Sequence, residues 1–79
     1  MTTTFTEFQL NNASENPIAV AIEPWGDVRL VEARSSMRLR IEGPLSNDPS
    51  QVLIVQIENE KRVSVWGWTG SAITEVTQP

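Results

Sequence analysis

Apolar and polar residues alternate in three stretches of the chain, which is the spacing of half-buried β-strands. Residues 37–42 read MRLRIE, which puts three aliphatic side chains on one face and three charged side chains on the other. Residues 18–23 read IAVAIE, with aliphatic side chains on one face and two small alanines on the other. In residues 63–68, which read VSVWGW, two valines lie opposite a serine and two tryptophans. The sequence therefore predicts three strands that each bury one face.

Residues 52–57 read VLIVQI, a continuous apolar run that is rich in β-branched side chains and short for a helix. Such a run is typical of a strand in the middle of a sheet, with at least part of both faces covered. Weaker strand patterns cover residues 5–10, 28–32 and 72–77. A short helix over residues 28–34 is the alternative for one of them. The total is about seven short strands.

Turn-forming residues separate these segments. They form a polar connection at 11–17, a tight turn at 24–27, hairpin loops at 33–36 and 58–61, a long loop at 43–50 and a break at 69–71. Connections this short favour antiparallel neighbours, because a parallel return needs a longer crossover. We therefore predict an all-β fold, a small antiparallel β-sandwich or partly open barrel.

The chain has 79 residues, which suits a single β-domain over residues 1–79 with an ordered core at about 5–77. It contains no cysteine and no histidine. That composition excludes disulfides, thiolate metal sites and catalytic arrangements that need a histidine base. We expect no enzymatic activity, no catalytic residues, no metal site and no cofactor.

Six basic residues against ten acidic ones give a net charge of −4. This balance argues against binding to duplex nucleic acid or to anionic lipid. The N-terminal residues, MTTTFT, lack the basic and apolar regions of a secretory signal, and no apolar run is long enough to span a membrane. We expect a cytoplasmic protein with no membrane contact.

The three tryptophans are the first candidate binding residues. Trp66 and Trp68 fall on the same face of their predicted strand, and Trp25 sits in a turn after a proline. If that face is exposed, two indoles on one strand form a flat platform for a sugar or for a partner protein. The alternative is ordinary core packing of the indoles against Ala19 and Ala21.

Arg38 and Arg40 are the second candidates, because they project from one face of their predicted strand. Guanidinium groups placed in this way can clamp a carboxylate or a phosphate. The alternative is a solvated strand face whose arginines pair with glutamates of neighbouring strands, which contributes little to stability. The candidates for these pairings are Glu23, Glu32, Glu42 and Glu58.

The turn IEPWGD at 22–27 and the stretch VSVWGWTGS at 63–71 resemble parts of small bacterial all-β proteins of uncharacterised function. In these proteins an EPWG-like turn precedes a strand pair and a Val-x-x-Gly motif closes the domain. The resemblance covers residues 17–76. It implies an all-β fold, and it gives no activity that could be transferred to this chain. The strand order is also similar to a trimmed cupredoxin or jelly-roll sandwich. Since histidine and cysteine are absent, this second likeness implies architecture alone.

The leading functional hypothesis is a small, non-catalytic binding module whose partner is another protein, with a homodimer as the simplest case. One alternative is a carbohydrate-binding module that uses its tryptophans. A second alternative is an acidic inhibitor or decoy linked to a phage or a toxin, although a net charge of −4 is modest for mimicry of nucleic acid.

Overall fold

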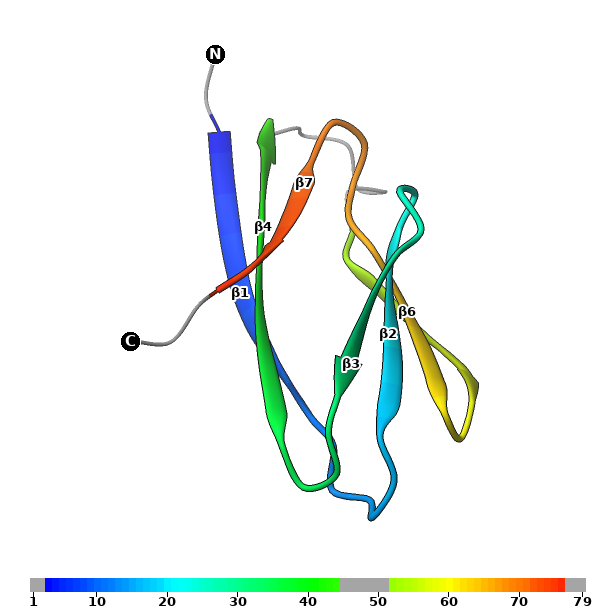
Figure 1. Cartoon of the computed structure of the whole chain (residues 1–79). Coiled ribbons are helices and arrows are strands. Elements are labelled where there is room, and N and C mark those ends of the chain that lie inside the picture. The colour runs from blue at the N-terminus through cyan, green and yellow to red at the C-terminus, as the bar shows by residue number, and fades with distance from the viewer. Residues whose placement is uncertain (1–2, 45–51, 77–79) are drawn as a thin grey trace.

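The computed structural model describes residues 3–44 and 52–76, and all its regular elements are β-strands (Figure 1). They are β1 (Thr3–Asn11), β2 (Ile18–Glu23), β3 (Asp27–Val31), β4 (Ser36–Pro44), β5 (Ile54–Asn59), β6 (Arg62–Trp66) and β7 (Ala72–Glu75). The predicted number of strands is confirmed. The helical alternative for residues 28–34 is wrong, because most of that segment belongs to β3.

The strands form two sheets that lie face to face as a sandwich (Figure 1). Sheet A has the order β1-β4-β7, and sheet B has the order β3-β2-β6-β5. The predicted sandwich is confirmed, and the sheets do not close into a barrel. Four of the five strand pairs are antiparallel, whereas β2 and β6 run parallel.

The core lies between β2 and β6 of sheet B and β4 of sheet A. It is formed by the residues that the alternation places on one face of each strand, as predicted. These residues are Val20, Ile22, Val31, Met37, Leu39, Ile41 and Val65, all of them buried. Phe8, Leu10, Leu53 and Ile73 pack around this cluster and are partly buried. The period of two thus assigns each strand its buried face.

Two predicted hairpins form, and one does not. β2 and β3 are joined at the tight turn 24–26, and β5 and β6 at residues 60–61. The predicted hairpin at 33–36 instead carries the chain from β3 in sheet B to β4 in sheet A. The segment 67–71 likewise crosses from β6 to β7. Turn residues show that the chain reverses, but not which sheet the next strand joins. Most of the predicted loop at 43–50 lies outside the described residues.

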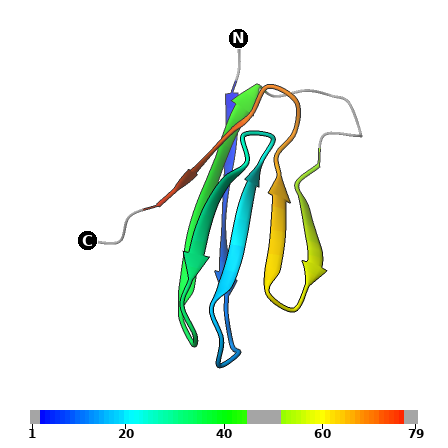
Figure 2. The same ribbon diagram turned by 45° about the vertical axis from the view of Figure 1, so that its right-hand side comes forward.

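The prediction that residues 52–57 form a central strand is wrong. Most of it forms β5, which is the edge strand of sheet B, and all six β5 residues are exposed. Sheet B has one strand more than sheet A, and the β5–β6 hairpin extends beyond the strands of sheet A (Figure 2). Ile57 is therefore 78% exposed although its register partner is the core-facing Val63. An apolar strand that no second sheet covers has the same local sequence pattern as a strand that is buried on both faces.

Asn12 ties together the two connections at one end of the sandwich. Its side-chain amide lies within donating distance of the carbonyls of Asn16, Val31 and Glu32, at 2.8, 3.0 and 3.1 Å. Its Oδ1 accepts from the N–H and the hydroxyl of Ser14. Its own backbone N–H donates to the carbonyl of Ser35. Because Asn12 is only 3% exposed, these bonds satisfy groups that water does not reach.

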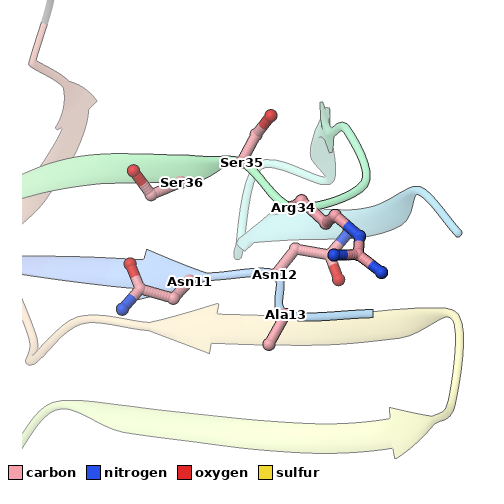
Figure 3. Close-up of a pocket in the computed structure, with 6 residues that line it drawn as sticks. All are labelled: Asn11, Asn12, Ala13, Arg34, Ser35 and Ser36. Carbon is pink, nitrogen blue, oxygen red and sulfur yellow. The ribbon is translucent and has the colours of Figure 1, made fainter. Parts of the chain in front are cut away.

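A hollow of about 450 Å³ adjoins this tie. Figure 3 shows that Asn12 and Ala13 of the β1–β2 connection lie beside Arg34 and Ser35 of the β3–β4 connection. The Arg34 N–H donates to the carbonyl of Ser14, and its guanidinium pairs with Glu15 at 2.6 Å. Arg34 also adopts a left-handed backbone with φ of 57°. The hollow is thus lined by residues that hold the two connections together.

We predict that Asn12→Ala lowers the free energy of unfolding by ~2–3 kcal/mol, because it removes the donor to the buried carbonyl of Val31 and the hydrogen bonds that join the two connections. The neighbouring Asn11→Ala is the control, since Asn11 is exposed and accepts only from Gln9. It should cost less than ~0.5 kcal/mol. Urea denaturation followed by circular dichroism measures both values. Equal losses in the two variants would contradict the role of Asn12.

A second prediction compares the core with the edge. Leu39→Ala should cost ~2–5 kcal/mol, because Leu39 is fully buried between the sheets. Val55→Ala should cost about 1 kcal/mol or less, because Val55 lies on the edge strand and is 43% exposed. The same denaturation assay distinguishes the two. A loss at Val55 as large as that at Leu39 would mean that β5 is covered in solution.

Candidate functional site

The face of sheet B that points away from the core exposes several large apolar side chains between polar and charged residues at its edges and ends. Strand register places residues that pair across neighbouring strands on the same side of the sheet. We call this surface the sheet B outer face; it consists of Ala19, Ala21, Glu23, Val28, Leu30, Ile54, Gln56, Arg62, Ser64 and Trp66. The hydroxyl of Ser64 donates to Oε1 of Glu58 on this same side at 2.5 Å.

Small side chains form the middle of this face and larger ones its flanks. Ala21 and Ser64 are buried although they point away from the core. Leu30 is 59% exposed on one flank, and Val28 and Ile54 are each about half exposed. Aliphatic side chains of β3 and β5 therefore contribute exposed apolar area on both flanks.

The outer face of sheet A has the opposite character. Arg40 pairs with Glu42 at 3.0 Å along its own strand and with Glu7 across to β1 at 4.0 Å. Its guanidinium also lies 3.8 Å from the centroid of the Phe5 ring. Arg38 projects from the same face, as predicted, and donates to Gln9 at 3.5 Å. The charges of this face are largely matched within the sheet, which agrees with the solvated-face alternative for the two arginines.

The predicted tryptophan platform on one strand is wrong in its geometry. β6 ends at Trp66, and the chain then leaves sheet B at Gly67 to cross toward β7. Trp66 stays on the sheet B outer face, beside Glu23 on β2 and Ile54 on β5, and is 39% exposed. Trp68 lies in the crossing segment, where its Nε1 is buried with no partner among the described residues.

The structure nevertheless brings all three tryptophans together. They line one groove of about 490 Å³ at the end of sheet B, which we call the tryptophan groove. Its lining residues are Glu23, Pro24, Trp25, Trp66, Gly67, Trp68, Thr69, Gly70 and Ser71. Trp25 reaches it from the β2–β3 turn and is 56% exposed. The three predicted residues therefore line one groove and do not form a flat platform.

Glycine at position 43 lets the crossing segment approach β4. A Cβ at Gly43 would lie 2.7 Å from Cα of Ser71 and 2.9 Å from Nε1 of Trp68. Both distances are shorter than an ordinary van der Waals contact. The position of Trp68, and hence one wall of the groove, thus requires a residue without a side chain on β4.

The groove has few polar side chains. Glu23 is partly buried and has no ion-pair partner among residues 3–44 and 52–76. The hydroxyl of Ser71 donates to the carbonyl of Trp68 at 2.6 Å. The described part of the chain holds no cluster of three or more metal-ligating residues. The arrangement suits binding through aromatic and apolar contact.

Sequence reasoning did not identify Glu23 or the apolar sheet B outer face as candidates. A signal was present in residues 18–22, which read IAVAI and carry no polar residue on either face of the strand. The alternation by itself predicts these alanines as a surface on which the tryptophans pack. Glu23 lies beside Trp66 because β2 and β6 pair in parallel, and no local sequence pattern predicts that pairing.

Comparison of the chain with models of protein families, with curated proteins and with solved structures gave no match. In the described residues, no helix is long and apolar enough to cross a membrane.

We predict that Trp25 and Trp66 carry most of the solvent-accessible tryptophan fluorescence. The double variant Trp25→Phe/Trp66→Phe leaves only Trp68, whose Nε1 is buried. Its emission should lie at shorter wavelength than that of the unaltered chain and resist quenching by acrylamide. The same variant unfolded in guanidinium chloride is the reference for full exposure. Quenching of the folded double variant as strong as that of the unaltered chain would contradict the partly buried position of Trp68.

Proposed function

We propose that this chain is a non-catalytic module that binds another protein through the sheet B outer face. The observation that carries the proposal is the contrast between the two outer faces of the sandwich. Sheet A pairs its charges with one another, whereas sheet B presents aliphatic and aromatic side chains. A second copy of the chain is the simplest partner. The proposal keeps the cytoplasmic location expected from the sequence.

Physical reasons support binding at this face. The solvent-facing side of an antiparallel sheet normally carries polar residues, so large exposed apolar side chains grouped on one side are an exception that association would relieve. Burial of apolar surface contributes roughly 25 cal/mol per Å². Trp66 and Trp25 stand at one end of the face, and exposed tryptophans frequently carry much of the binding energy at protein interfaces.

The carbohydrate-binding alternative would use the same tryptophans but has less support. Recognition of a sugar combines stacking with several hydrogen bonds to its hydroxyl groups. In the tryptophan groove, the Ser71 hydroxyl is engaged with the Trp68 carbonyl, and Nε1 of Trp68 is buried. Glu23, Thr69 and the indole N–H groups of Trp25 and Trp66 are the side-chain groups of the groove that remain for this purpose.

The acidic decoy alternative also has less support. Mimicry of nucleic acid needs carboxylates arranged in an uninterrupted array. Five carboxylates of the described residues instead lie beside arginines, namely Glu7, Glu15, Asp27, Glu42 and Glu75. Local pairing of this kind cancels much of the field that a decoy would present.

The proposal predicts position-specific cross-linking. A photo-reactive phenylalanine derivative at Leu30 on sheet B should form adducts of discrete mass in the producing cell, and the same residue at Gln9 on sheet A should not. Mass spectrometry identifies the adduct, and binding to the purified partner should be lost in Leu30→Lys. Size-exclusion chromatography with light scattering recognises a homodimer. Equal cross-linking at both positions, or none at Leu30, would refute the proposal.

A further inference from the structure

We infer that the tryptophan groove receives a cationic side chain, a lysine ammonium or an arginine guanidinium, from the protein that docks on the sheet B outer face. This inference rests on the proposed function and deepens it, because it names the chemistry of the partner. Its basis is the combination of three indoles and one unpaired carboxylate in one groove.

The groove is continuous with the proposed docking face. Glu23 is the register partner of Trp66 in the parallel β2–β6 pair, and Ile54 is its register partner on β5. These three side chains form the last row of sheet B before the groove. A partner seated on the sheet B outer face thus meets the groove at its edge and can insert a long side chain there.

The walls of the groove are suited to a cation. The faces of indole rings carry negative potential and attract ammonium and guanidinium groups more strongly than other aromatic side chains do. Trp25 and Trp66 are the more exposed walls. Nε1 of Trp68 is buried, so the part of this ring that lines the groove is carbon. The long aliphatic stems of lysine and arginine also pack well against such walls.

Glu23 supplies the opposite charge. It is partly buried in the groove lining, and no basic group of the described residues lies within ion-pair distance of it. Arg29, the basic residue nearest in the β2–β3 hairpin, is engaged with Asp27 at 3.1 Å and with Glu75 at 3.6 Å. A partly desolvated carboxylate is stabilised when a cation binds beside it.

The chain contains an internal example of the same chemistry. On sheet A, the Arg40 guanidinium lies over the Phe5 ring and between the carboxylates of Glu7 and Glu42. The tryptophan groove offers more aromatic surface and a carboxylate. It differs from the site on sheet A in that the described residues supply no cation of their own. The net charge of −4 further favours a positively charged partner.

The test is titration of the purified chain with Nα-acetyl-lysine amide and Nα-acetyl-arginine amide, followed by NMR of the three indole N–H signals. The matched neutral probes are the Nε-acetylated lysine derivative and the citrulline derivative. We expect the cationic probes to shift the signals of Trp25 and Trp66 with Kd values in the millimolar range, and the neutral probes to shift them far less.

Variants then separate the contributions of charge and ring. Glu23→Gln should weaken binding of the cationic probes roughly 2- to 30-fold. Glu32→Gln is the matched control. It removes the same charge just after the last residue of β3, at the end of the β2–β3 hairpin away from the groove, and should leave the Kd unchanged. Trp25→Phe should retain more affinity than Trp25→Leu, because phenylalanine keeps an aromatic face and leucine keeps only apolar contact. All these positions are at least partly exposed, so the variants should fold.

Three results would overturn the inference. They are equal binding of neutral and cationic probes, equal effects of Glu23→Gln and Glu32→Gln, and saturable shifts of the same indoles by neutral oligosaccharides with none by the cations. If the cations fail to bind while cross-linking at Leu30 persists, the inference falls and the proposed function stands. If the cations bind but Leu30 forms no adduct, the groove takes a free cation and not a partner's side chain.

Discussion

The burial of one face of β2 against one face of β4 governs the remaining arrangement of this protein. Both strands alternate strictly, so burying Val20 and Ile22 against Met37, Leu39 and Ile41 fixes which residues face outward. A slip of one residue in β4 would place Arg38 and Arg40 inside the sandwich, at a large cost in free energy. The two outer faces are thus consequences of the core.

These outer faces differ because the residues opposite the core residues differ. In β4 they are charged, and they find partners on β1 and along their own strand. In β2 they are alanines, which leave larger neighbours on β3 and β6 to define the surface. The unequal numbers of strands add to this asymmetry, since β5 extends beyond sheet A. One outer face pairs its charges within the sheet, and the other exposes aliphatic and aromatic side chains.

The tryptophan groove arises where the chain leaves one sheet for the other. β6 ends at Trp66, and the crossing segment turns Trp68 toward β4, where Gly43 leaves space for it. The β2–β3 turn adds Trp25, and the parallel pairing of β2 with β6 adds Glu23. The groove is therefore lined by two separate segments of the chain, residues 23–25 and 66–71. Its chemistry follows from the topology as much as from the residue types.

The local pattern was sufficient to identify the strands and the buried residues, and to select the three tryptophans as candidate binding residues. The reason is that a period of two and the side-chain types are properties of short segments. It could not show that most of residues 52–57 form the edge strand of sheet B or that β2 and β6 run parallel. Nor could it show that β6 ends at Trp66, so that Trp68 lies outside the strand. Each of these depends on which strands become neighbours and on what covers them. Those contacts join residues far apart in sequence, so they are decided by strand pairing within each sheet and by packing between the sheets.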